Sequence, residues 1–255
     1  MSLKNSVSVK TKVRHRNGIN STLSNMPLAA RRVLFLAMIQ FDPKHIIKKD
    51  SVFKVTASDY AAICDIDNSK AYGQLRDAAK QLQQQLIAIP KEQLLPPIYR
   101  PGEKPWVRPE GKGVRMMNIT EYCDYEEGSG FIEISFSRQM EPYICKLEKD
   151  YTTQFLISSV RLNDTNAMRI YQYLREKIGK GKTEYIDILV DDLKNDLGVD
   201  DVETYESFKY FNDTFFKRSV KQIIKKTEFN SIEMVITERL KRKAHKVRII
   251  YSYDK

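Results

Sequence analysis

The sequence predicts an α+β protein in which one order of helices and strands occurs twice. Each half contains a helix, a short strand, two further helices and a β-hairpin, in that order. The two halves also align in sequence, because Tyr72, Leu75 and Leu82 fall on Tyr205, Phe208 and Phe215 at one constant shift. A repeat that keeps the same element order indicates duplication of one module.

The first half begins with a basic stretch and continues with regular elements. Residues 1–20 hold five Lys or Arg residues and no acid, so we expect a flexible basic arm. An apolar run that starts near Pro27 predicts a helix over residues 24–41, capped by Ser24 or Asn25. The strand and two helices expected next are residues 52–56, 59–66 and 70–89.

The remainder of the first half carries most of the prolines. Six of the nine prolines lie in residues 90–113, which predicts a long surface excursion without regular structure. Residues 114–125 and 131–136 flank a glycine-containing turn and predict a β-hairpin. We expect one more helix over residues 138–149, interrupted near Pro142.

The second half repeats this order. Asp164 caps an amphipathic helix that we expect to run to residue 178. A strand over 185–189 and a helix over 191–197 follow. The longest expected helix covers residues 203–227, where apolar side chains recur at helical spacing. These apolar positions are Tyr205, Phe208, Phe211, Phe215, Ser219 or Val220, and Ile223.

Two alternating strands, residues 232–238 and 246–253, close the second half around a basic tip. A helix-turn-helix followed by a β-hairpin is the winged-helix arrangement. The sequence therefore predicts two tandem winged-helix domains related by an internal duplication. We expect the basic arm over residues 1–20, the first domain over residues 21–150 and the second domain over residues 151–255.

The charge distribution favours a polyanionic partner. The chain has a formal net charge of +10. Residues 181–206 hold two basic and nine acidic residues, whereas residues 207–255 hold thirteen basic and five acidic ones. An acidic block followed by a basic block predicts two differently charged faces on one domain.

The sequence lacks the motifs of catalytic and metal-binding proteins. The three cysteines and three histidines are scattered without metal-ligand spacing, so we expect no metal and no cofactor. The stretch GKGKT at 179–183 is not a phosphate loop, because Glu176 stands where such a loop needs glycine. No apolar run reaches the length of a membrane span, so we expect no membrane partner. We predict a protein that is not an enzyme.

Nucleic-acid binding remains, and the two domains differ in their suitability for it. A winged helix places its second helix in the major groove and its hairpin along the phosphates. Both of these elements are basic in the second domain. The hairpin of the first domain instead carries Glu121, Asp124, Glu126 and Glu127, which phosphate would repel. We therefore expect the second domain to bind double-stranded DNA and the first to make protein contacts.

Several stretches of the chain resemble plasmid replication initiators of the iteron-binding family, typified by the initiator of the F plasmid. The similarity extends from about Leu23 to Tyr253. The stretches that carry it are LSNMPLAARRVLFLA, AYGQLRDAAKQL, FIEISFSRQMEPYICKLEKDYTTQFLISSVRLNDTNAMRIYQYLRE and YESFKYFNDTFFKRSVKQI.

The resemblance implies a function and a set of partners. Monomers are expected to bind direct repeats at a plasmid origin, help to open the adjacent duplex, and recruit the host initiator and the replicative helicase. Dimers formed mainly through the first domain are expected to repress the initiator's own promoter through an inverted repeat. Chaperones are expected to aid the change from dimer to monomer, and the location is the bacterial cytoplasm.

The resemblance also implies DNA-contacting positions on the long helix of the second domain. The family usually has Lys or Arg just after the residue matching Phe211, whereas this chain continues with Asn212, Asp213 and Thr214. Asn can pair with adenine and Asp with cytosine, so the repeat read here should differ. The expected base contacts are Ser207, Tyr210, Asn212, Asp213 and Thr214. The expected phosphate contacts are Lys209, Lys217, Lys221, Arg242, Lys243 and Lys246.

Three alternatives remain open at this point. A dimeric winged-helix repressor without an initiator role would have the same fold. A rolling-circle nicking enzyme is disfavoured because the sequence lacks the histidine pair that would bind its metal. A pure protein-interaction scaffold is disfavoured by the segregated basic charge.

Overall fold

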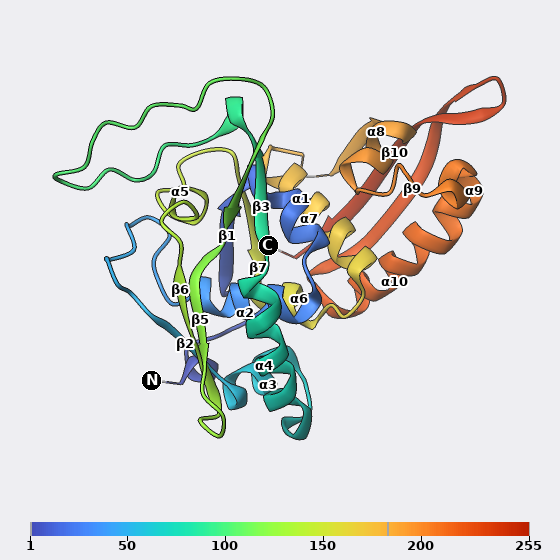
Figure 1. Cartoon of the computed structure of the whole chain (residues 1–255). Coiled ribbons are helices and arrows are strands. Elements are labelled where there is room, and N and C mark those ends of the chain that lie inside the picture. Colours follow the sequence, from blue (N-terminus) through green and yellow to red (C-terminus); the bar gives the residue numbers. More distant parts are fainter. Residues whose placement is uncertain (1, 183, 255) are drawn as a thin grey trace. The chain divides into compact units, whose positions relative to one another are not determined.

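The structure is a computed structural model that describes residues 2–182 and 184–254 (Figure 1). The chain divides into two compact units, Met1–Arg161 and Leu162–Lys255, each with its own apolar core. Both units are mixtures of helices and strands. The predicted α+β class is therefore confirmed.

Unit 1 contains three small antiparallel sheets and six helices among its described residues. Its helices are α1 (Asn20–Asn25), α2 (Leu28–Met38), α3 (Ala57–Cys64), α4 (Asn68–Gln83), α5 (Glu141–Ile144) and α6 (Leu156–Arg161). Its strands are β1 (Lys12–Arg16), β2 (Phe53–Thr56), β3 (Leu86–Pro90), β4 (Val114–Asn118), β5 (Thr120–Tyr125), β6 (Phe131–Phe136) and β7 (Tyr151–Phe155). The sheets have the strand orders β2-β6-β5, β3-β4 and β1-β7.

The described residues of unit 2 form one three-stranded antiparallel sheet, with the order β8-β10-β9. Its elements are α7 (Thr165–Gly179), β8 (Tyr185–Leu189), α8 (Val190–Asp196), α9 (Phe208–Tyr210), a π-helical segment (Phe211–Phe216), α10 (Lys217–Lys226), β9 (Phe229–Leu240) and β10 (Lys243–Tyr253). In both units the short strand before the helix pair joins the last strand of the hairpin. This shared order confirms two tandem winged-helix domains.

The long helix of unit 2 begins at Phe208, later than the sequence predicted. Residues 203–206 form only a 3₁₀ turn, and Ser207 is extended. Its hydroxyl caps the helix by accepting the Tyr210 N–H at 3.4 Å. From Phe208 the α9 segment, the π segment and α10 continue without a break to Lys226 and form what we call the recognition helix (Figure 1).

The π segment alters which side chains of the recognition helix are buried. Phe211, Phe215 and Phe216 are all at most 2% exposed, because the wider turn brings two adjacent residues to the core. The rings of Phe211 and Phe215 stack with centroids 5.3 Å apart. Tyr205 and Phe208, expected on the buried face, are only half-buried at its margin.

The N-terminal residues do not form the flexible arm that their charge predicted. Residues 12–16 pair with residues 151–155 as an antiparallel two-stranded sheet. Val13 and His15 are buried, and His15 Nε2 lies 2.9 Å from the Gln154 amide nitrogen. Alternate side chains of this strand thus join the core of unit 1, and the intervening basic residues face outward.

The boundary between the units lies after Arg161, not after residue 150 as predicted. The reason is that β7 pairs with β1, and α6 packs on α2 and α3. Arg32 Nε donates to the Val160 carbonyl at 2.7 Å, which ties α6 to the first core. The predicted start of the second domain therefore belongs to unit 1.

Four local predictions in unit 1 were wrong. The helix expected over 24–41 is divided, because Met26 and Pro27 are extended between α1 and α2. Residues 86–90 form β3 rather than the end of a helix, since Ile87 and Ile89 alternate toward the core. Residues 114–118 pair with β3 instead of extending the hairpin. The helix expected over 138–149 is only the short α5.

The proline-rich segment runs as a long loop between β3 and β4, with a single 3₁₀ turn at Lys91–Gln93 (Figure 1). Two of its own side chains, Leu94 and Ile98, are buried. Arg138 donates to the Ile98 carbonyl at 2.6 Å, and Arg108 donates to the Glu92 carbonyl at 2.9 Å. The loop is thus held to unit 1 at several points. None of the helices described is long and apolar enough to cross a membrane.

Candidate nucleic-acid interface

A broad groove of about 1110 Å³ lies in unit 2 between the recognition helix and the hairpin of β9 and β10, which we call the wing. Residues of α8 line its inner end, where the Lys194 ammonium lies 5.9 Å from the centre of the Phe211 ring. The helix contributes Ser207, Lys209, Asn212, Asp213 and Lys217 among its lining residues. The wing contributes Arg239, Lys241, Arg242, Lys243 and His245.

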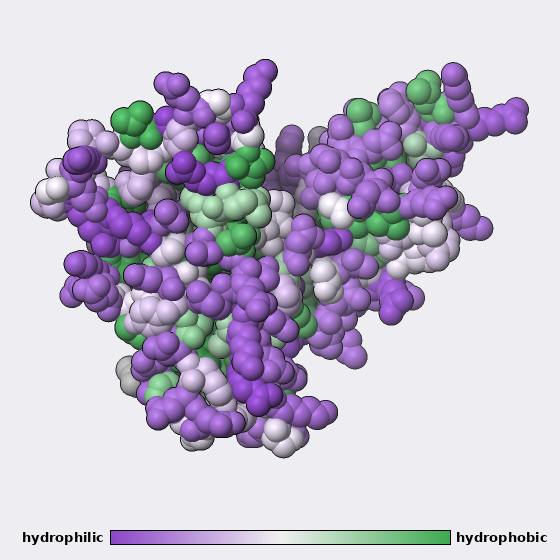
Figure 2. All heavy atoms as spheres, in the orientation of Figure 1, coloured by the Kyte–Doolittle hydropathy of each residue, from purple (hydrophilic) through white to green (hydrophobic). Residues whose placement is uncertain are grey.

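The wing ends in a two-residue turn of unusual composition. Leu240 pairs with Lys243, and both intervening residues, Lys241 and Arg242, have positive φ angles of 48° and 68°. Two-residue hairpin turns of this kind normally take Asn and Gly, because a Cβ disfavours the left-handed conformation. Figure 2 shows mainly hydrophilic side chains over this projecting tip. Two long cations therefore occupy the tip despite an unfavourable backbone.

The predicted base-contacting residues lie on two flanks of the recognition helix. Ser207, Asn212 and Asp213 line the groove beside the wing. Tyr210 and Thr214 line a different pocket on the other flank. The structure therefore places four of the five residues on the recognition helix and Ser207 at its N-cap, but it does not bring them into one cluster.

The five side chains differ in the hydrogen bonds that they make within the protein. The Oδ1 atom of Asn212 is shielded from solvent and lacks a hydrogen-bond partner among the residues described. The ammonium of Lys217 donates to Asp213 Oδ1 at 2.8 Å, and this hydrogen bond holds the pKa of Asp213 below its ordinary value. Thr214 Oγ1 donates to the Tyr210 carbonyl at 2.7 Å. The Ser207 hydroxyl accepts a hydrogen bond from the first turn of the helix, so this side chain has a structural role apart from any contact with a ligand.

The predicted phosphate-contacting residues are also divided. Lys209, Lys217, Arg242 and Lys243 line the groove. Lys221 lies on the opposite flank of the recognition helix, where it lines a shallow hollow together with Arg218 and Lys225. Lys246 is half-buried in β10 and is absent from the groove lining.

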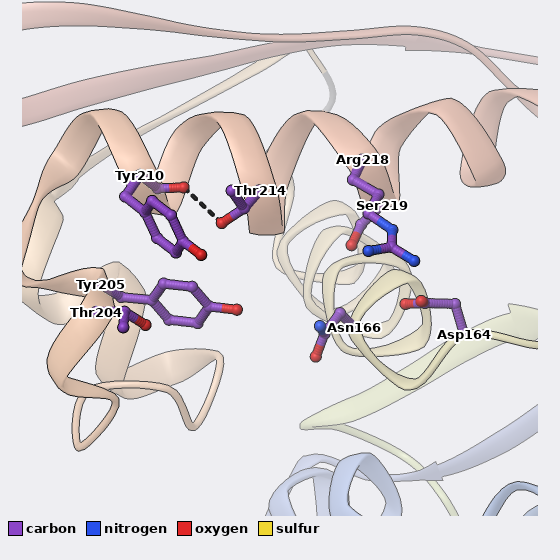
Figure 3. A pocket seen from close by; sticks show the side chains of 8 residues that line it. All are labelled: Asp164, Asn166, Thr204, Tyr205, Tyr210, Thr214, Arg218 and Ser219. Atoms are coloured by element: carbon purple, nitrogen blue, oxygen red, sulfur yellow. Dashed lines mark hydrogen bonds between the residues drawn. The ribbon is translucent and has the colours of Figure 1, made fainter.

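The pocket on the opposite flank, which we call the α7-side pocket, has a volume of about 300 Å³ (Figure 3). It is lined by Asp164, Asn166, Thr204, Tyr205, Tyr210, Thr214, Arg218 and Ser219. The sequence analysis did not single out Arg218 or Asn166. Helical spacing would have found Arg218, because it follows Tyr210 and Thr214 at steps of four residues.

The corresponding surface of unit 1 has a different charge. Along α4, Arg76 forms an ion pair of 3.3 Å with its neighbour Asp77, which leaves that face nearly neutral. On the β5–β6 hairpin, Glu121, Asp124 and Glu126 are exposed. The described residues contain no group of three or more His, Cys, Asp or Glu side chains arranged to hold a metal ion.

Two winged-helix units, one with a basic groove beside its recognition helix, define the DNA-binding winged-helix class. Comparison with known proteins identifies the family. Residues 12–175 match the family described as "Initiator Replication protein, WH1". The chain therefore belongs to this family of plasmid replication initiators, as its sequence motifs predicted.

Individual relatives agree with this assignment. The chain is 32% identical to the "PI protein" of Escherichia coli, over 97% of this chain and 85% of that protein. It is 24% identical to a "Replication initiation protein" of Escherichia coli, over 75% of this chain and 54% of the relative.

Solved structures extend the similarity to the fold. A crystal structure of the Pi initiator protein in complex with iteron DNA matches with a TM-score of 0.82 and 30% identity, over 98% of this chain and all of that one. Domains 2 and 3 of RctB share the fold, with a TM-score of 0.51 and 12% identity.

Proposed function

We propose that the protein initiates plasmid replication by binding repeated origin sequences, the iterons, through its second winged-helix unit. The observation that carries this proposal is the groove between the recognition helix and the wing. The polar side chains of Asn212 and Asp213 line this groove together with lysine and arginine side chains from both elements. The similarity to an initiator whose structure contains iteron DNA supports the proposal.

In this proposal two side chains in the groove read bases. Asn212 lines the groove, and its amide suits adenine, which offers a donor and an acceptor side by side. Its Oδ1 atom is shielded from solvent in the free protein, so in this proposal the side chain rotates toward the groove when it pairs with a base. Asp213 suits cytosine, and its carboxylate is already ionised and oriented by Lys217. Both are reached from the major groove, where the four base pairs are distinguishable.

The basic residues of the groove are proposed to hold phosphates. Lys209 and Lys217 project from the recognition helix, and Arg242 and Lys243 project from the wing. Such contacts add affinity for any sequence and make binding sensitive to salt. We expect Lys246 to contribute less, because it is half-buried outside the groove lining.

The proposal extends to the assembly of the origin. Monomers bind direct repeats, promote opening of the adjacent duplex and recruit the host initiator and replicative helicase in the bacterial cytoplasm. Dimers formed through unit 1 repress the protein's own promoter at an inverted repeat, and chaperones assist the change to monomers. The acidic hairpin of unit 1 supports a role in protein contacts, since it is poorly suited to phosphate. In this proposal the protein has no catalytic activity.

Footprinting on DNA from the flanks of its own gene, at two salt concentrations, tests this function. We expect several tandem protected repeats spaced by whole helical turns of about 10 base pairs. Protection of one inverted repeat at the promoter alone would favour a repressor. Salt-sensitive binding without any footprint would refute sequence-specific initiation.

A variant pair separates base reading from general binding. Asn212→Ala should weaken binding to the specific repeat by about 1–3 kcal/mol and relax preference at one base position. Lys243→Gln, in the wing, should instead weaken binding to all sequences and lower the salt slope by about one unit. Equal losses on specific and random DNA for Asn212→Ala would remove this residue from base reading.

A further inference from the structure

The α7-side pocket gathers hydrogen-bond donors that have no partner. Neither the Tyr205 and Tyr210 hydroxyls nor the side chains of Asn166 and Arg218 make a hydrogen bond or ion pair within the described part of the chain. Figure 3 shows the two tyrosine rings, from the 3₁₀ turn and the recognition helix, on one side of the space. Asn166 and Arg218 lie on its other side. Four donors around one space of about 300 Å³ fit an acceptor-rich ligand.

The charge of this region favours an anion. Arg218 also lines the neighbouring hollow, which adds Lys221 and Lys225 to the same flank. The carboxylate of Asp164 lines both spaces and caps α7 by accepting the Ala167 N–H at 2.8 Å. Its single negative charge is outnumbered by Arg218, Lys221 and Lys225. A guanidinium with neighbouring hydroxyl and amide donors matches the oxygens of a phosphate.

The position of the pocket relates it to DNA. It lies on the flank of the recognition helix that faces away from the wing, because Tyr210 and Thr214 line it whereas Asn212 and Asp213 line the groove. A helix with its side chains is about 10–12 Å wide and fills a major groove of about 12 Å. Its two flanks therefore meet the phosphates of opposite strands.

We propose that the α7-side pocket binds a backbone phosphate of the DNA strand opposite to the strand held by the lysines of the groove. Arg218 is the main ligand, and Tyr205, Tyr210 and Asn166 complete the site. Tyr210 and Thr214, expected from the sequence to contact bases, then position the DNA instead of reading it. The hydroxyl of Thr214 supports this role, since it is engaged with the helix backbone. The inference rests on the proposed binding of DNA by unit 2.

The test compares Arg218→Gln with the wild-type full-length chain on its specific duplex. Removing one phosphate contact should lower the slope of log K against log salt by about 0.9. The affinity loss between 50 and 200 mM salt should then be about 3- to 4-fold smaller for the variant. Ethylation interference should disappear at one phosphate of one strand, and base preferences should stay unchanged at every position.

Three further variants make the result specific. Lys209→Gln should remove interference at one phosphate of the other strand and leave the phosphate assigned to Arg218 unchanged. Tyr210→Phe removes only a hydroxyl and should weaken the same phosphate contact as Arg218→Gln. Lys180→Gln removes an equal charge at the far end of α7, where Lys180 pairs with Glu176, and should leave the interference pattern intact.

The outcomes are distinguishable. An unchanged salt slope and interference pattern in Arg218→Gln would overturn the phosphate site. Altered preference at one base position would also overturn it, because the pocket would then hold a base edge. If the wild-type chain gave no footprint, the proposed initiator function would fail, and the salt slopes on random duplex would still decide whether Arg218 contacts phosphate.

Discussion

The turn at the tip of the wing allows a test in which stability and DNA affinity change in opposite directions. Lys241 and Arg242 both adopt the left-handed conformation, which costs about 1–2 kcal/mol for each residue that carries a Cβ. Replacing them by Asn and Gly (Lys241→Asn with Arg242→Gly) supplies the residues that this turn prefers. Glycine loses more conformational entropy on folding than other residues do, and this loss reduces the gain in stability by about 0.5–1 kcal/mol. Because Asn keeps a Cβ and relieves only part of the cost at its position, we expect a net stabilisation of the wing of about 1–2 kcal/mol.

Hydrogen exchange of the full-length chain measures this change where it occurs. The amides of β9 and β10 next to the turn should exchange about 5- to 30-fold more slowly in the double variant, which corresponds to 1–2 kcal/mol. The same variant lacks two cations at the tip, so its salt slope on DNA should fall by as much as about 1.8.

The matched control, Lys241→Ala with Arg242→Ala, removes the charges but keeps the unfavourable conformation. It should lose DNA affinity like the first variant and show no protection of the strands. Unchanged or faster exchange in the Asn-Gly variant would refute the reasoning, because the turn would then hold no strain that these residues relieve. Unchanged DNA affinity in both variants would exclude the tip from the interface.

Three further predictions concern packing and ionisation. Phe211→Ala should lower the free energy of unfolding by about 3–5 kcal/mol in a denaturant titration, since the fully buried ring stacks on Phe215; an unchanged midpoint would show that the core tolerates its loss. Glu228→Gln should destabilise unit 2 by about 3–5 kcal/mol, because it replaces the carboxylate that pairs with the nearly buried Arg175 at 3.2 Å by a neutral amide; calorimetry would detect this as a lower melting temperature. Burial raises the pKa of the Cys64 thiol to about 12, so the native protein should resist alkylation there at pH 8 and react in denaturant; rapid labelling of native Cys64 would contradict the packing of α3.

The elements of unit 2 could be predicted well from the sequence because local signals agreed with the packing. Asp164 caps α7 as its position before an amphipathic run indicated. The wing strands follow the expected alternation, with Val247 and Ile249 buried between more exposed neighbours. The π segment could not be predicted, because periodicity arguments assume one constant helical turn and Phe216 falls outside that pattern.

The elements of unit 1 were harder to predict, because several of its strands pair with segments that are distant in the sequence. The strand β1 is rich in Lys and Arg, and only its distant partner β7 makes it a strand. Likewise β3 follows directly on a strong helical sequence, and its pairing with β4 crosses the proline-rich loop. Composition described the charge of these segments correctly but not their partners, since pairing over long sequence separations leaves no local signal.

The candidate site was predicted on the recognition helix and the wing, and the structure divides the helix residues between two flanks. The basic groove contains Asn212 and Asp213, whereas Tyr210 and Thr214 face the α7-side pocket. Residue spacing alone did not separate these flanks, because the division depends on where the wing and α7 pack against the recognition helix. Arg218 follows Tyr210 and Thr214 at helical spacing, so the sequence carried a signal for this residue that the prediction did not include.

The pairing of β1 with β7 also constrains how the protein folds during synthesis. His15 and Gln154 meet across 139 positions of the chain. At about 5–20 residues per second, the ribosome needs on the order of 10 s to make the partner of a strand that has already emerged. An unpaired strand is prone to aggregate, and positive charge along its edge discourages association with other chains. We therefore expect the lysines and arginines of this strand to oppose aggregation of a nascent chain until its first unit closes.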